Sequence, residues 1–168
     1  METKKVVALI IALIIIIAIA IVIEVIVENA IKESSLQDLR TNMLLIQGKA
    51  KTYTENVNLE TANLSEEKEE DNTKITEVKN EKLKGIALEN CDEKIKAEAK
   101  KAGIEDTKDY YYLSEQDLKD MQLNIKVKED EYYLVKYNFQ DTEVIYTKGY
   151  KYNDKIYYKL SELKNIEL

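Results

Sequence analysis

Hydrophobic residues follow one another without interruption near the start of this 168-residue chain. Residues 6–23 contain no charged or polar side chain, no glycine and no proline. A helix over these eighteen residues is about 27 Å long, which is close to the hydrocarbon thickness of a bilayer. Lipid offers no hydrogen-bond partner to a lone strand, so the stretch predicts a helix although β-branched residues dominate it.

Three interpretations of this apolar stretch compete. A cleaved signal peptide ends in small residues, and the sequence EVIVE at 24–28 offers none. A buried core helix would have to be covered on every side. A membrane anchor accounts for the stretch best, and the apolar residues that follow Glu24 extend the expected transmembrane helix over residues 6–27.

The charges on either side of this helix predict its orientation. Lys4 and Lys5 precede it, whereas Glu24 lies at its outer boundary and Glu28 and Glu33 follow it, with only Lys32 among them. The positive-inside rule therefore predicts a cytoplasmic tail at residues 1–5, a single crossing of the cell membrane and an extracytoplasmic C-terminal part.

The pattern becomes periodic after the apolar stretch. Over residues 28–57 apolar positions recur at steps of three and four, which places them on one side of a helix. We therefore expect one helix over residues 6–56, whose stripe is covered by the chain's own C-terminal part, by the same helix in neighbouring copies, or by both on different faces. The candidate residues for a helix-bundle interface are Ile31, Leu39, Met43, Ile46, Ala50 and Tyr53.

Residues 58–73 are rich in Glu and predict a solvated loop. A calcium site was considered there, but alternating Asp ligands with a glycine turn are missing. Residues 74–102 predict one or two amphipathic helices, with Gly85 as a dividing point, Gly103 as a stop and Cys91 inside a helix.

The last third of the chain predicts strands. Residues 109–113 form a short candidate strand, and Ser114 with Asp117 forms a capping arrangement for a short helix. From Ile125 the period changes to two, and Asn153-Asp154 is a hairpin-turn dipeptide. The expected fold is α+β: a long N-terminal helix, and an extracytoplasmic head over 74–168 with short helices and an antiparallel meander of three or four strands.

Eleven of the twelve tyrosines fall after residue 109. Tyrosine favours strands and tolerates a wet hydroxyl, so a thin sheet half-covered by a helix accounts for them. An aromatic surface for a cell-wall glycan or for a neighbouring subunit is the alternative.

Composition narrows the chemistry. A net charge of −7 argues against a nucleic-acid partner. The chain has no histidine, which removes His-based catalysis and His-ligated zinc. Two carboxylate pairs, Asp117 with Asp120 and Asp141 with Glu143, are the remaining candidates for acid–base work. Because these lie at a helix start and a turn, we expect no enzyme, no catalytic residue, no cofactor and no metal.

This layout resembles that of type IV pilins and of the pilin-like proteins of type II secretion and competence systems. Two stretches carry the resemblance to such proteins of Gram-positive bacteria: AIKESSLQDLRTNMLLIQGKAKTYTENV, and the hairpin EYYLVKYNFQDTEVIYTKGY. The Gly of the prepilin cleavage motif does not precede Val6, and the early Glu is replaced by Ile10. No processing residue is therefore carried over.

The resemblance implies a membrane-anchored structural subunit that assembles with other pilin-like subunits, of the same or of different kinds. The alternative is a single-pass tethered module that binds cell-wall glycan or a protein.

Overall fold

A computed structural model describes residues 2–62, 71–138 and 140–167, without the side chains of residues 2–26, 28–29, 71–73, 76 and 80. The chain divides into two compact units, Met1–Asp38 with Leu168, and Leu39–Glu167. The second unit contains the sheet and the short helices, and it is called the head from here on. The elements in chain order are α1 (Glu2–Ala62), α2 (Asp71–Lys82), β1 (Ile86–Ala87), the 3₁₀ turn η1 (Leu88–Asn90), α3 (Glu93–Lys101), β2 (Tyr110–Leu113), α4 (Glu115–Asp120), β3 (Tyr133–Lys136), β4 (Glu143–Tyr152), β5 (Lys155–Lys159) and α5 (Leu160–Leu163).

Helix α1 confirms the expected long helix and ends at Ala62 rather than at residue 56. No proline interrupts it, and the Thr61 hydroxyl donates to the carbonyl of Val57 at 2.8 Å, which supports the added turn. Among the residues whose side chains are described, no helix is long and apolar enough to cross a bilayer. The expected transmembrane helix over residues 6–27 lies, apart from Val27, outside the described side chains.

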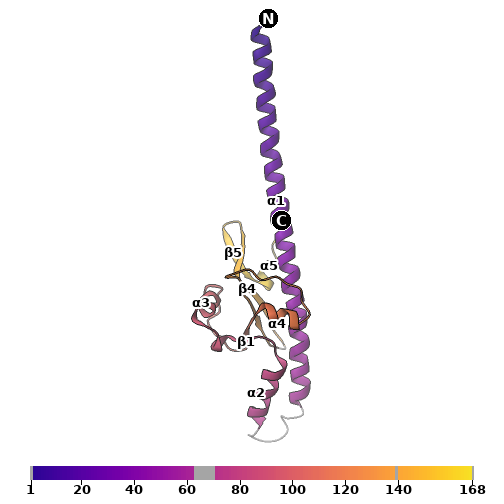
Figure 1. Cartoon of the computed structure of the whole chain (residues 1–168), viewed down its shortest axis with the longest axis vertical. Coiled ribbons are helices and arrows are strands. Elements are labelled where there is room, and N and C mark those ends of the chain that lie inside the picture. The colour runs from indigo at the N-terminus through magenta and orange to yellow at the C-terminus, as the bar shows by residue number, and fades with distance from the viewer. Residues whose placement is uncertain (1, 63–70, 139, 168) are drawn as a thin grey trace. The chain divides into compact units, whose positions relative to one another are not determined.

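The sheet has five strands in the order β1-β2-β3-β4-β5, and every neighbouring pair is antiparallel. The α+β class and the antiparallel meander are therefore confirmed, with one more strand than expected. Ile86 pairs with Tyr112, which adds β1 at one edge. Figure 1 shows the sheet beside the C-terminal half of α1.

Strand β4 is continuous over the ten residues Glu143–Tyr152. Its register with β5 shifts between Ile145 and Tyr150, so a bulge absorbs the irregularity instead of a turn. Gly149 has φ 68°, and a Cβ there would lie 2.3 Å from Cγ2 of Ile156. The turn at Asn153 and Asp154 has φ values of 47° and 59°, which confirms the predicted hairpin.

Both faces of the sheet are covered. Leu134 and Ile145 pair across β3 and β4, and both pack against Ile95 and Ala99 of α3. The other face of β3 carries Tyr133, whose hydroxyl bonds with Asn42 of α1. Figure 1 shows α3 and this part of α1 on opposite sides of the sheet. Two helical layers thus enclose a thin core.

Local signals at helix ends are confirmed in two places. Ser114 accepts from the amide of Asp117, whose carboxylate accepts from the amide of Ser114 at 2.8 Å, closing the capping box of α4. Gly103 follows α3 with φ 83°, and the amide of Ile104 donates to the carbonyl of Ala99. This is the glycine-ended Schellman arrangement.

The prediction that Cys91 lies in a helix is wrong. Cys91 lies between η1 and α3, because the Asp92 carboxylate accepts from the amide of Ile95 at 2.9 Å and begins α3 after it. Its side chain is buried against the α3 side of the sheet. Burial raises the pKa of the Cys91 thiol, so it packs as a neutral, unreactive group.

The only arginine connects the first residues of the head with its last residues in the sequence. The Nε and Nη2 atoms of Arg40, on α1, both donate to the carbonyl of Leu163, at 2.9 and 2.5 Å, and Nη2 also donates to that of Ile166. Leu163 is the last residue of the short helix α5, Ile166 follows it, and both are buried. The carbonyl of Leu163 also accepts from the amide of Ile166 at 3.2 Å, so the guanidinium adds charge-assisted hydrogen bonds to the end of this helix.

Candidate interaction face on the long helix

The part of α1 inside the head has a covered side and an open side. Met43, Ile46 and Ala50 are fully buried. The chain's own head therefore covers three of the six residues that the sequence assigned to a helix bundle. Leu39 and Tyr53 are half-buried, and Ile31, in the other unit, is 60% exposed. A bundle contact through the latter three stays a prediction.

The open side of α1 carries a run of uncharged residues, next to the exposed charges of Lys51 and Glu55. Five exposed residues follow one another at steps of three and four, which places them on one surface of the helix. We call this set the outer face; it consists of Thr41, Leu44, Leu45, Gly48 and Thr52. Leu44 and Leu45 are 46% and 48% exposed. In a chain with 34% charged residues, a helical surface of leucine, glycine and threonine is typical of a contact with another protein.

Gly48 is the least expected residue of the outer face. It lies in the interior of α1 and is not among the glycines with positive φ. A Cβ built on it meets nothing within 4 Å. Neither backbone conformation nor packing within the chain requires glycine there, although glycine costs a helix about 0.5–1 kcal/mol relative to alanine. A close approach by another molecule would account for it.

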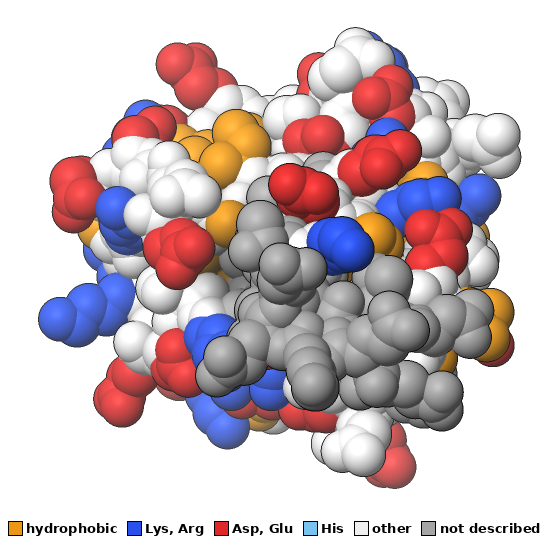
Figure 2. Space-filling model, turned by 90° about the horizontal axis from the view of Figure 1, so that it is seen from below, with side chains coloured by type: hydrophobic (Ala, Val, Ile, Leu, Met, Phe, Trp, Pro, Cys, Tyr) orange, Lys and Arg blue, Asp and Glu red, His pale blue; other side chains and the backbone are white. Residues whose placement is uncertain are grey.

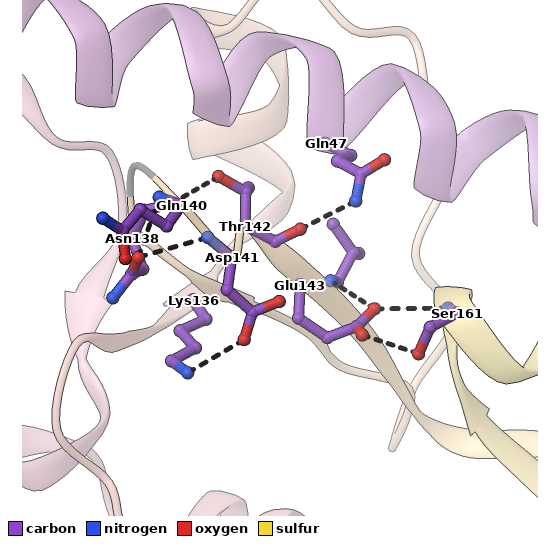
Figure 3. A network of polar contacts seen from close by, with 9 residues as sticks. Gln47, Lys136, Asn138, Gln140, Asp141, Thr142, Glu143 and Ser161 are labelled. Carbon is purple, nitrogen blue, oxygen red and sulfur yellow. Dashed lines mark hydrogen bonds and ion pairs between the residues drawn. The ribbon is translucent and has the colours of Figure 1, made fainter.

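Polar residues beside the outer face are held by the head. The Gln47 amide donates to the carbonyl of Thr142 at 2.7 Å (Figure 3). Lys49 reaches the side-chain oxygen of Gln122 at 3.4 Å. These contacts point Gln47 and Lys49 toward the head, whereas Lys51 and Glu55 stay exposed beside the outer face.

The carboxylates considered for acid–base chemistry all have structural partners. Asp117 belongs to the α4 capping box, and Asp120 accepts from the amide of Gln116. Asp141 pairs with Lys136 at 3.3 Å, and Glu143 accepts from the Ser161 hydroxyl at 2.7 Å; Figure 3 shows both.

Over residues 2–62, 71–138 and 140–167, as far as side chains are described, no three acidic or Cys side chains are grouped as metal ligands.

The tyrosines pack into the sheet. Tyr111 lies edge-on to Tyr137, and Tyr112 lies edge-on to Tyr132, with ring centroids 5.1 and 5.7 Å apart. Burial raises the pKa of Tyr133 to about 12, against a smaller opposing effect of its bond with Asn42. Every tyrosine after residue 109 is buried or half-buried, so most of each ring is covered within the head.

Comparisons with protein-family models, with curated proteins and with solved structures found no match. The outer face was missed by reasoning from sequence, because none of its residues is among the six candidates for a helix-bundle interface. The signal that could have found it is a mid-helix glycine among uncharged residues at helical spacing.

Proposed function

We propose that this protein is a membrane-anchored, pilin-like structural subunit of a type IV pilus, type II secretion-like or competence-like surface assembly. Residues 6–27 anchor it in the cell membrane with the N-terminus in the cytoplasm. The head lies outside and contacts neighbouring subunits through the outer face of α1. The protein's work is packing, and it catalyses no reaction.

The outer face carries this proposal. Leucine side chains that are nearly half exposed gain free energy when a partner covers them, by about 25 cal/mol per Å² of apolar surface. Gly48 between them leaves room for a second helix to approach closely. The architecture adds support, since a long helix with an apolar start and an antiparallel sheet packed on its second half agree with the resemblance in sequence.

Cysteine cross-linking in membranes of cells that make the full chain tests the contact. The native Cys91 is buried and adds little background. We expect Leu45→Cys to give a disulfide-linked species between subunits under mild oxidation, because a helix-to-helix contact brings such positions together. The control is Ile156→Cys, on β5, where the native side chain is 44% exposed and similarly apolar.

A second pair of variants checks the energetics. Leu44→Glu should lower co-purification of differently tagged subunits about tenfold. The carboxylate replaces an apolar side chain at the contact, and assembly would have to remove its bound water at a cost in free energy. Ile156→Glu should leave co-purification unchanged. If Leu45→Cys does not cross-link, or if both glutamate variants weaken association equally, the outer face is not the assembly contact.

A single-pass tethered binding module is the second candidate function. The half-buried tyrosines give little support to a glycan platform on the sheet. A pocket at another place in the head favours this candidate more, and it is described next.

A further inference from the structure

A pocket of about 310 Å³ opens where four segments of the head meet. Two turns of α1, the end of α2, the residue before β2 and the connection after β3 contribute to it. Its lining consists of Thr54, Val57, Asn58, Lys79, Leu83, Asp109, Tyr137, Asn138 and Gln140. The volume lies at the lower end of the range for small-molecule sites and suits a ligand of one or two amino-acid residues.

The floor of the pocket is apolar and rigid. Val57, Leu83 and Tyr137 are 3%, 8% and 6% exposed. The Tyr137 hydroxyl donates to the carbonyl of Lys84 at 2.9 Å, which fixes the ring and leaves its polar end occupied. This floor offers contact to a small apolar side chain and no hydrogen bond.

The rim, by contrast, carries polar side chains without a direct contact in the described head, although the charge of Asp109 acts on Lys136. Within the described part of the chain, the side chains of Asn58, Lys79, Asp109 and Gln140 make no hydrogen bond or ion pair. Thr54, in contrast, donates to the carbonyl of Ala50 at 2.9 Å. The unused set contains one cation, one anion and two amides.

The two rim charges do not neutralise each other. Lys79 and Asp109 are both half-buried and line the same pocket, yet no ion pair joins them. Among the side chains coloured in Figure 2, acidic and basic ones lie close to one another at one end of the molecule. A ligand with a single charge would be attracted by one rim group and repelled by the other.

We propose that this pocket binds a small zwitterionic ligand, an amino acid or dipeptide with a free ammonium and a free carboxylate. Lys79 pairs with the carboxylate, and Asp109 pairs with the ammonium. The amides of Asn58 and Gln140 bond with the peptide linkage between the two charges. A small side chain, such as a methyl group, lies on the floor formed by Val57 and Leu83.

This inference does not rest on the assembly role, because the rim residues are different from the outer face. It gives a ligand class to the second candidate function, and its readout is independent of cross-linking between subunits.

Saturation-transfer NMR with the full chain, in a detergent without peptide or sugar groups, tests the proposal. The probe is dialanine, and the matched controls are dialanine amide, which lacks the carboxylate, and N-acetyl-dialanine, which lacks the ammonium. We expect dialanine to bind and each blocked form to bind about tenfold more weakly, since each loses one charge-assisted hydrogen bond. An N-acetylated disaccharide serves as a neutral probe.

Two conservative variants assign the roles. Lys79→Gln should weaken the binding of dialanine about tenfold, and this variant should bind dialanine and dialanine amide equally. Asp109→Asn should also weaken the binding of dialanine about tenfold, and this variant should bind dialanine and N-acetyl-dialanine equally. Asparagine tolerates the φ of 61° at this position, so folding is preserved. Lys100→Gln, an exposed lysine on α3, is the control, and near-ultraviolet circular dichroism checks the fold of each variant.

The proposal is overturned if dialanine does not bind, if the blocked forms bind equally well, or if Lys79→Gln and Lys100→Gln behave alike. Binding of the disaccharide with no response to dialanine also overturns it, in favour of a saccharide site.

Discussion

Replacing Gly48 and Gly103 by alanine should change stability in opposite directions. At both positions a new Cβ meets nothing within 4 Å, so steric contact makes no difference between them. The two positions differ in backbone conformation, because Gly48 lies inside α1 without a positive φ, whereas Gly103 ends α3 with φ 83°. The pair therefore separates helix propensity from left-handed backbone strain at equal side-chain volume.

The magnitudes follow from these two conformations. Gly48→Ala should raise the free energy of unfolding of the head by about 0.5–1 kcal/mol, because alanine loses less backbone entropy in a helix. Gly103→Ala should lower it by about 1–2 kcal/mol, because an L side chain in the left-handed region clashes with its own carbonyl. For a chain of this size, 1 kcal/mol corresponds to about 2–4 °C in Tm.

Thermal and urea unfolding of the full chain, followed by tyrosine signals in the near ultraviolet, measure the effect. Eleven of the twelve tyrosines lie after residue 109, so this signal reports the head. Changes of the same sign in both variants would refute the reasoning. A Gly48→Ala variant that is less stable as a separate chain would also remove the argument that glycine there serves a partner.

Two further predictions concern the buried polar contacts of the head. Arg40→Ala should lower the free energy of unfolding by about 1.5–3 kcal/mol, since the carbonyls of Leu163 and Ile166 lose their hydrogen bonds to the guanidinium. Arg40→Lys should cost less, and equal losses in urea unfolding would contradict the bidentate geometry. Burial alone would raise the pKa of Glu131, but Lys148 at 2.9 Å and a tyrosine hydroxyl outweigh it and hold that pKa below its usual value of 4.5. A lowered pKa stabilises the fold above that value, so stability should decline as the pH falls below about 4.5, and Glu131→Gln should flatten this decline in acid unfolding curves.

The sequence by itself determined the features that depend on neighbouring residues. The continuous helix follows from the absence of proline, and the end of α3 follows from Gly103. The capping box at Ser114 and the hairpin turn at Asn153 also formed as predicted. Each of these is set by hydrogen bonds within a few residues, so spacing and residue type are sufficient to predict it.

Tertiary structure decided the rest. Periodicity identified an apolar stripe on α1, but only the packed sheet shows that Met43 is covered while Leu44 is not. The two-residue strand β1 forms because its Ile86 pairs with Tyr112 of β2, and no local sequence pattern predicts a strand so short. The pocket with Lys79 and Asp109 on its rim is assembled from four separated segments, and contacts between such segments are fixed by the packing of the whole head.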